Sequence, residues 1–137
     1  MKVMLDPMAI MPTRAHKTDA GLDLYTPHEF TLHDGQSITI DTGVHIELPH
    51  GCYGKIESKS GLNVNNGIVC CGGVIDEGYT GSIAVKLYNL EPGDYYFMAG
   101  DKIAQLIVQK CLYEGLELTD ELDDTDRGCH GFGSTGK

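Results

Sequence analysis

A glycine-rich run near the C-terminal end carries groups that could bind phosphate. The stretch from Arg127 to Lys137, RGCHGFGSTGK, combines glycines with Ser134, Thr135 and two cations. Backbone amides freed by glycine, hydroxyls and a positive charge together suit phosphate oxygens. Its GxxxxGK spacing matches part of a P-loop, but no Ser or Thr and no helix follow it in the sequence. We therefore expect a lid that closes over a polyphosphate bound elsewhere, with a frayed terminus as the alternative.

Two neighbouring carboxylates lie near the middle of the chain, in GGVIDEGYTG from Gly72 to Gly81. Asp76 and Glu77 follow an apolar stretch, 68–75, that reads as one strand entering a hairpin, so their side chains are expected to face opposite ways. One of them could then face a cleft and orient or deprotonate a water molecule, an effect typically worth about 10² to 10⁴ in rate. A plain Asp-Glu-Gly turn is the alternative interpretation.

Composition indicates one folded domain with an acidic surface. The chain has 137 residues, 41% of them hydrophobic, and a formal net charge of −10. The negative charge argues against a nucleic-acid surface, so a phosphate ligand would need a few local donors, helped by a divalent cation. No apolar run reaches the roughly 18 residues of a membrane span. No signal-peptide core is evident at the start, which predicts a cytoplasmic protein, or one in the host cytoplasm if viral.

The cysteines favour reduced thiols over a zinc site or a disulfide framework. Five cysteines are an odd number, and no two of them form a CxxC pair. His130 beside Cys129 is at most a weak hint of metal binding.

Short alternating runs separated by Gly, Pro, Asn and Asp dominate the chain and predict strands. This spacing predicts an all-β protein, a sandwich, jelly roll or barrel, with at most one short helix between Lys59 and Asn66. The acidic stretch from Thr119 to Asp126 reads as a solvated linker, which divides the chain into a β domain, 1–118, and a linker with a glycine-rich arm, 119–137. The expected strands are 22–25, 30–32, 37–40, 44–48, 53–58, 68–71, 82–88, 95–98 and 103–108.

Five segments resemble, in order, the five motifs of the trimeric deoxyuridine triphosphatases (dUTPases). They are AGLDLYT (20–26), ESKSGL (57–62), GVIDEGYTGSI (73–83), GDKIAQLIV (100–108) and RGCHGFGSTG (127–136). The resemblance implies a distorted jelly-roll, or β-clip, protomer with a flexible C-terminal arm. It also implies a homotrimer with shared active sites, in which the arm of one chain closes over a site built by the others.

By the same resemblance, the reaction would be hydrolysis of dUTP to dUMP and pyrophosphate with Mg²⁺. This removes dUTP and supplies dUMP for thymidylate synthesis. Asp76 would be catalytic and orient the water that attacks the α-phosphorus. Asp23 would meet Mg²⁺ through water, consistent with a cation that keeps several of its waters. Tyr79 would pack under the deoxyribose and leave no room for a 2′-hydroxyl.

The remaining residues implied by the resemblance bind the base and the phosphates. The uracil edge would be bound by the hairpin backbone around Gly73, Val74 and Ile75, with Ala84 on the returning strand. The phosphates would be held by Lys59, Ser60 and Gly61, with Gln105 near the α-phosphate. In the arm, Arg127 would pair with the γ-phosphate, Phe132 would stack on the base, and Gly133, Ser134 and Thr135 would wrap the phosphates.

Some positions depart from the family pattern, and two other functions stay open. Lys59 stands where an arginine is usual, so a bidentate grip becomes a point charge and phosphate orientation is expected to be weaker. Cys129-His130 replaces a pair of small residues. The related dCTP deaminases carry a catalytic Glu at the position of Lys86, and a lysine cannot fill that role. A regulator that binds another protein under nucleotide control is the second alternative.

Overall fold

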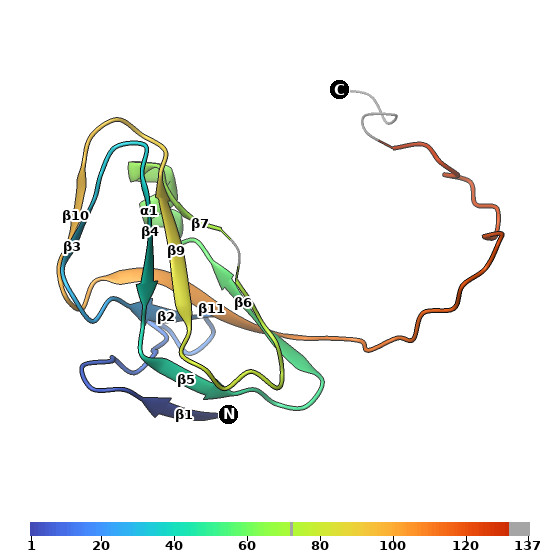
Figure 1. Ribbon diagram of the computed structural model, residues 1–137, viewed down its shortest axis with the longest axis horizontal. Helices are drawn as coiled ribbons and strands as arrows, with labels where there is room; N and C mark the ends of the chain where they lie inside the picture. The colour runs from blue at the N-terminus through green and yellow to red at the C-terminus, as the bar shows by residue number, and fades with distance from the viewer. Residues whose placement is uncertain (72, 132–137) are drawn as a thin grey trace.

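A computed structural model describes residues 1–71 and 73–131 (Figure 1). Within these residues the chain forms short strands and one short helix, which confirms the all-β prediction. The elements are β1 (Lys2–Leu5), β2 (Gly21–Tyr25), β3 (Phe30–Leu32), β4 (Ser37–Asp41), β5 (Val44–Glu47), β6 (Cys52–Glu57), α1 (Ser60–Asn66), β7 (Ile68–Cys70), β8 (Val74–Ile75), β9 (Ala84–Asn89), β10 (Tyr95–Phe97) and β11 (Lys102–Lys110).

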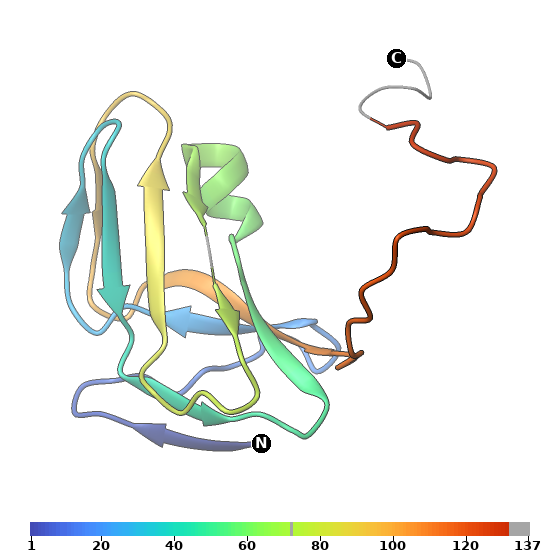
Figure 2. The same ribbon diagram turned by 45° about the vertical axis from the view of Figure 1, so that its right-hand side comes forward.

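The strands form two larger sheets and two antiparallel pairs. The largest sheet has the order β2-β11-β6-β8, and the second has the order β4-β9-β7. Strand β1 pairs with β5, and β3 pairs with β10. Figures 1 and 2 show the strands of the two larger sheets crossing one another, with α1 at one end of the body. Because every pairing is antiparallel, each strand can turn one face to the interior and one to the surface.

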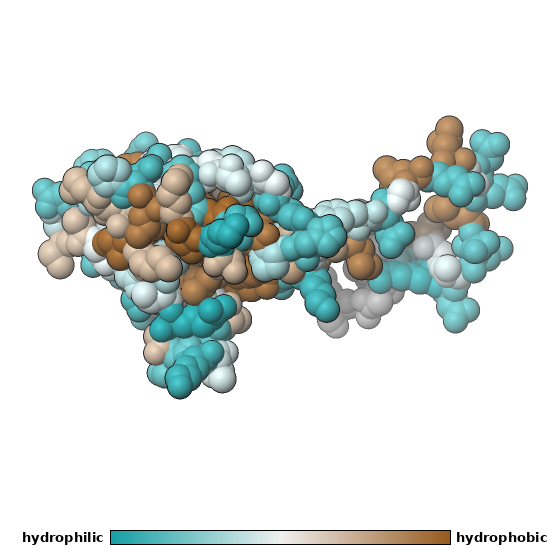
Figure 3. All heavy atoms as spheres, turned by 90° about the horizontal axis from the view of Figure 1, so that it is seen from below, coloured by the Kyte–Doolittle hydropathy of each residue, from teal (hydrophilic) through white to brown (hydrophobic). Residues whose placement is uncertain are grey.

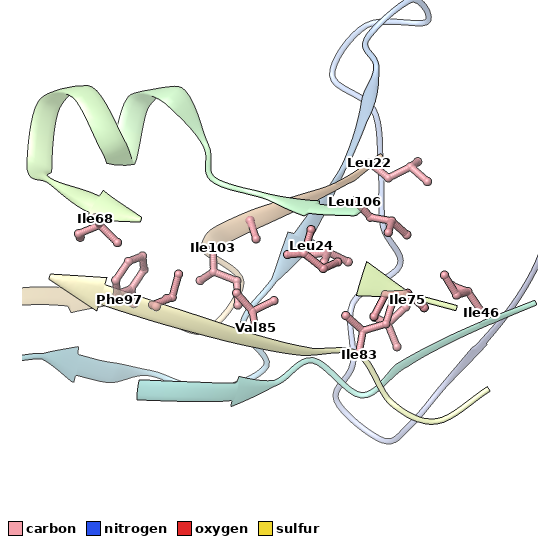
Figure 4. Close-up of a cluster of buried hydrophobic side chains, with 14 of the residues drawn as sticks. Leu22, Leu24, Ile46, Ile68, Ile75, Ile83, Val85, Phe97, Ile103 and Leu106 are labelled. Atoms are coloured by element: carbon pink, nitrogen blue, oxygen red, sulfur yellow. The ribbon is translucent and has the colours of Figure 1, made fainter. Parts of the chain in front are cut away.

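A single apolar core fills the space between the sheets (Figure 4). Strand β9 shows how the sequence builds it, since Val85, Leu87 and Asn89 are buried while the residues between them are more exposed. This is the period-2 pattern of a strand with one inner face. The largest fully buried side chains include Leu24, Phe97, Ile103 and Leu106, from the three strands β2, β10 and β11. The core therefore fixes the two larger sheets relative to each other.

The apolar stretch that the sequence suggests as one strand, 68–75, is divided between two sheets. Strand β7 pairs with β9, whereas β8 pairs with β6 at the other large sheet. Gly73 lies at this crossing with a φ of 119°. A Cβ there would lie 2.6 Å from Cβ of Ile56, and Gly73 O accepts a hydrogen bond from Ile56 N at 2.8 Å. Only glycine fits such a close backbone approach at that φ, and a run of apolar letters does not reveal it.

The short helix has a glycine cap, and the first strand was not predicted. Helix α1 ends at Asn66 and is capped by Gly67, whose φ of 61° lets its N–H donate to the carbonyl oxygens of Asn63 and Leu62. Strand β1 has no counterpart among the predicted strands, because its side chains are mostly exposed and only its pairing with β5 reveals it.

After β11 the residues 111–131 form no helix or strand and leave the body as an extended segment (Figure 1). Apolar side chains stand exposed along this segment (Figure 3). No helix in the described parts of the chain is long and apolar enough to cross a bilayer.

Candidate active site

A cluster of three charges links β2 to two lysines from distant parts of the chain. Lys59 Nζ donates to Oδ1 of Asp23 at 2.5 Å, and Lys102 Nζ lies 2.7 Å from Oδ2. The Asp23 side chain is only 9% exposed, whereas the two lysines are 27% and 41% exposed. Two cations share one carboxylate, so the cluster carries a net charge of +1 on a strongly acidic chain. Such a cluster attracts a phosphate group.

The cluster settles the ionisation of Asp23. Burial opposes the charged form and would raise the pKa of this carboxyl. The hydrogen bonds and charges of Lys102 and Lys59 outweigh that effect, so the pKa of Asp23 lies below its ordinary value. The carboxylate is therefore fixed as an anion between two cations.

Gln105 completes this part of the candidate site. In the sheet register it lies between Asp23 on β2 and Glu57 on β6, so the three side chains share one face. Its Nε2 donates to Ser58 O at 3.0 Å. Gly21 makes room for it, since a Cβ there would lie 2.2 Å from Oε1 of Gln105. Around Gln105 the sheet thus brings together three of the five motif segments, which lie far apart in the sequence.

The predicted phosphate-binding segment 59–61 lies beside this cluster, at the start of α1. Ser60 and Gly61 form the first residues of the helix and are exposed. Lys59 precedes them in an extended conformation and directs its ammonium group to Asp23. In the structure the ammonium group of Lys59 is paired with the Asp23 carboxylate.

Asp76 directly follows β8 and is exposed. Its carbonyl accepts a hydrogen bond from Tyr79 N at 3.0 Å, which closes a tight turn over Asp76–Tyr79. The ring of Tyr79 then folds back over Gly81, where a Cβ would lie 2.5 Å from the phenol oxygen. Tyr79 Oη donates to Ser82 O at 2.9 Å. Gly81 is therefore required for the position of this ring.

The predicted base-binding residues surround this turn. Gly73 and Val74 lie on the side of β6, where Val74 pairs with Lys55 and is 64% exposed. Ile75 belongs to the core and is only 8% exposed. Ala84 begins β9, pairs with Asp41 and is exposed.

Two polar networks hold the turn from outside. Glu77 accepts hydrogen bonds from Tyr113 Oη at 2.6 Å and from Gly51 N at 2.9 Å, and its Oε1 lies 2.8 Å from His50 Nδ1. These hydrogen bonds, from Tyr113 first, then His50 and Gly51, lower the pKa of Glu77 to about 2.

The second network lies at the far end of the turn. The ring of His45 bridges Thr80 O, 2.8 Å from Nδ1, and Asp6 Oδ2, 3.2 Å from Nε2. Ser82 Oγ donates to Asp41, whose carboxylate also accepts from Gly43 N. The turn that carries Asp76 and Tyr79 is thus anchored at both ends.

The Asp76 turn and the Asp23 cluster lie at opposite ends of β6. Ile75 pairs with Gly54 near the beginning of the strand, whereas Ser58 and Lys59 follow its end. At about 3.3 Å per residue, the strand separates the two groups by roughly 17 Å. One chain therefore does not bring Asp76 and Lys59 to the same phosphate.

The arm residues are only partly described. Arg127 is exposed, and its Nε donates to His130 O at 3.0 Å. Phe132, Gly133, Ser134 and Thr135 lie outside the described residues.

The side chains present fit an indirect contact with a metal ion better than direct ligation. Over residues 1–71 and 73–131, no three His, Cys, Asp or Glu side chains gather as a metal site. Each carboxylate oxygen of Asp23 already accepts a hydrogen bond from a lysine, Lys59 or Lys102. Carboxylate oxygens keep further lone pairs, so Asp23 can still accept a hydrogen bond from a metal-bound water.

Sequence reasoning missed three members of these networks. Lys102 lies within the fourth motif segment, but only the strand register brings it to Asp23. Tyr113 and His45 lie outside all five motif segments. Their partners are distant in sequence, so no local signal identifies them.

Comparison with known proteins points to one family. A family model described as dUTPase matches residues 8–136. Deoxyuridine 5′-triphosphate nucleotidohydrolase of Rattus norvegicus is 42% identical over 135 residues, which are 98% of this chain and 66% of that protein. The chain thus spans just under two thirds of the length of this relative.

Solved structures with the same fold include phage proteins. The dUTPase of Staphylococcus bacteriophage 80alpha with dUPNHPP has a TM-score of 0.90 at 29% identity, covering 99% of this chain and 98% of that one. A dUTPase mutant from phage phi11 of S. aureus, described with a structural Mg(II) ion, has a TM-score of 0.83 at 27% identity. That match covers 90% of this chain and 98% of the phage chain.

Proposed function

Because the chain belongs to the dUTPase family, we propose that it hydrolyses dUTP to dUMP and pyrophosphate. The observation that carries this proposal is the convergence of Lys59 and Lys102 on Asp23, with Gln105 beside Asp23 in the sheet. A positively charged cluster built from three separate motif segments is what a triphosphate site requires.

In this proposal Asp76 acts on the attacking water. A carboxylate exposed at a tight turn can accept a proton from a water molecule and aim its lone pair at the α-phosphorus. Attack there breaks the bond between the α-phosphorus and the bridging oxygen and releases pyrophosphate. The atoms of dUTP and water together are those of dUMP, pyrophosphate and the proton that is released.

The phosphates would be held by the end of β6 and the first turn of α1. Ser60 and Gly61 offer exposed groups there, and Gln105 lies on the same face of the sheet as Asp23. Lys59 would share its ammonium between Asp23 and a phosphate oxygen. A single ammonium cannot grip phosphate in two places as a guanidinium does, so we expect looser phosphate orientation than an arginine would give.

Base selection would rest on the backbone around Gly73, Val74 and Ile75, with Ala84 opposite. Uracil and cytosine exchange donor and acceptor groups at positions 3 and 4. A mismatched base would leave buried polar groups unpaired, which can give discrimination of about 10⁴ or more. Thymine differs only by a methyl group and must be excluded by shape. Tyr79 would exclude a ribose by occupying the space of its 2′-hydroxyl.

A homotrimer with sites between subunits would unite the two groups of residues. The distance of roughly 17 Å along β6 supports this, because Asp76 of one chain and Lys59 of another can meet where they are apart within a chain. The C-terminal arm of a third chain would then close over the nucleotide, with Arg127 on the γ-phosphate. Phe132 would stack on the base, and Gly133, Ser134 and Thr135 would wrap the phosphates. Closure would remove bulk water.

Mg²⁺ would be the cofactor. When bound to the triphosphate, it offsets negative charge that grows on the bridging and leaving oxygens. Asp23 would accept a hydrogen bond from a water bound to Mg²⁺, through lone pairs that Lys59 and Lys102 leave on its carboxylate oxygens. A cytoplasmic location stays a prediction.

One alternative function gains support from a comparison. Phage dUTPases are described as controlling the transfer of virulence genes by a G protein-like mechanism, and one of them shares this fold at 29% identity. A nucleotide-gated regulator is therefore the second candidate, and it is compatible with hydrolysis. The dCTP deaminase alternative fits less well, because Lys86 occupies the critical position, with its ammonium 5.7 Å from the centre of the Tyr88 ring.

Pyrophosphate release from dUTP, dTTP, dCTP and UTP, with and without Mg²⁺, tests the proposal. We expect turnover of dUTP well above the other three and dependence on Mg²⁺. Ammonia release from dCTP would favour the deaminase instead. An Asp76→Asn variant should bind a non-hydrolysable dUTP analogue normally while kcat falls by about 10² or more. Unchanged turnover in that variant would contradict the role of Asp76.

A further inference from the structure

Glu77 has an unusually complete set of partners for a surface carboxylate. Its two oxygens face Tyr113 Oη at 2.6 Å, His50 Nδ1 at 2.8 Å and Gly51 N at 2.9 Å. The Glu77 side chain is 28% exposed, although its partner ring Tyr113 is largely in solvent. These contacts lower the pKa of Glu77 and raise the pKa of Tyr113 to about 12, so the pair stays a phenol donating to a carboxylate near neutral pH.

The three partners come from two other parts of the chain. His50 and Gly51 form the turn between β5 and β6, and Tyr113 follows the end of β11 at Lys110. The same turn also holds the chain just beyond β11, because Cys111 N donates to Gly51 O at 2.8 Å. Glu77 is thus the point at which the Asp76 turn, the β5–β6 turn and the root of the C-terminal segment meet.

Asp76 and Tyr113 also share a surface. Both line a cleft of about 620 Å³, together with Glu77 and Tyr53. A movement of Tyr113 therefore changes the wall of the cleft that contains Asp76. Because Glu77 is the next residue to Asp76, its fixed carboxylate also limits how the Asp76 backbone can rotate.

A second tyrosine–glutamate pair provides a comparison within the molecule. Tyr96 Oη donates to Glu29 Oε2 at the same distance of 2.6 Å, and its ring is similarly exposed. This pair joins β10 to the chain before β3 and lies away from the Asp76 turn. It offers a matched control for a hydroxyl that is lost from an exposed tyrosine.

We propose that Glu77 is a positioning residue for Asp76, and that Tyr113 ties the root of the C-terminal segment to the Asp76 turn. The kinetic part of this inference rests on the proposed hydrolysis of dUTP. The C-terminal segment and Asp76 are coupled through Glu77. When the segment detaches at Tyr113, the hydrogen bond from Tyr113 to Glu77 breaks. Glu77 then holds the neighbouring Asp76 less firmly. Detachment of the C-terminal arm at Tyr113 would thereby change the position of Asp76 in the same chain.

Limited trypsin digestion tests the attachment without reference to activity. Lys110 directly precedes the proposed tie, and Arg127 lies in the exposed segment beyond it. Loss of one hydrogen bond of about 1 kcal/mol should raise cleavage after Lys110 roughly fivefold in Tyr113→Phe and Glu77→Gln. Cleavage after Arg127 should not change, and Tyr96→Phe should match the unmodified protein at both sites. An unchanged rate after Lys110 in Tyr113→Phe would overturn the tie.

Steady-state kinetics with dUTP test the positioning role. We expect kcat to fall roughly tenfold in Glu77→Gln and severalfold in Tyr113→Phe with KM little changed, because displacement of a catalytic group affects the chemical step. The double variant should lose no more than Glu77→Gln alone, since both changes break one contact. Additive losses, or a wild-type kcat in Tyr113→Phe, would refute the positioning role. Absence of dUTP hydrolysis in the unmodified protein would refute the proposed function instead, while the trypsin result would still decide the tie.

Discussion

The ammonium group of Lys102 lies 2.7 Å from Oδ2 of Asp23, the carboxylate oxygen that Lys59 leaves free. One buried carboxylate thereby fixes two lysines that come from different strand ends. This arrangement keeps the second motif segment beside the fourth before any nucleotide arrives.

Asp23→Asn should lower the free energy of unfolding by about 1 to 3 kcal/mol. The two lysines would lose their shared counter-ion, but their partial exposure moderates the loss. Urea unfolding monitored by circular dichroism measures the change. Asp120→Asn, in the exposed C-terminal segment, is the control and should have no effect. Equal stability of both variants would mean that the cluster contributes nothing to folding.

Tyr79→Ala should weaken the preference for deoxyribose roughly tenfold, as judged by the ratio of kcat/KM for dUTP to that for UTP. The alanine would remove the ring that folds over Gly81. Tyr79→Phe keeps the ring and loses only the hydrogen bond to Ser82, so its selectivity should stay near that of the unmodified protein. Should both variants discriminate equally well, the sugar is selected elsewhere.

Removal of residues 127–137 should reduce kcat/KM by about 10² or more and leave the fold intact, because the lid would be lost while the sheets and core lie within residues 1–110. Circular dichroism and thermal unfolding check the fold, and pyrophosphate release checks the activity. A shortened chain with full activity would exclude the lid.

His45 should make stability depend on pH. Both ring nitrogens face acceptors, so the doubly protonated ring donates to Thr80 O and to Asp6, and the hydrogen bonds raise the pKa of His45 above its ordinary value. Nearby Asp41 acts in the same direction. Because the folded pKa is raised, the stabilisation is complete below about pH 6.5 and is lost as the pH rises through the folded pKa.

Urea unfolding of the unmodified protein and His45→Gln at several pH values measures this effect. The difference in unfolding free energy should be largest near pH 6 and should shrink toward pH 8.5. Asp6→Asn should reduce the pH dependence, since it removes the negative charge of one of the two acceptors. A difference that stays constant with pH would show that His45 does not titrate in this range.

Much of the fold could be predicted from local patterns. Alternation and turn residues predicted a strand from 37 to 40, observed as β4 (Ser37–Asp41), because burial of one face gives the sequence a period of two. Strand β1 was not predicted, because its side chains are mostly exposed and its sequence therefore shows no alternation with a period of two. The division of the stretch 68–75 into two strands was not predicted either, because the close approach of Gly73 to Ile56 is a contact between segments distant in sequence.

The candidate site could be predicted as a set of residues but not as an arrangement. Motif resemblance identified Asp76 and Asp23, yet the register of β11 decides that Lys102 meets Asp23. The same limit applies to Glu77, whose partners His50 and Tyr113 lie 27 and 36 residues away in the chain. Neither relationship has a local signature.

The opposite placement of Lys59 and Asp76 along β6 has a genetic consequence if sites are shared between subunits. A chain defective only at position 59 and another defective only at position 76 would each be inactive alone. Co-assembled, they would regain some whole sites by intragenic complementation. Because each chain would supply one copy of each residue, a mixed assembly would lose one site for every chain damaged at a single position.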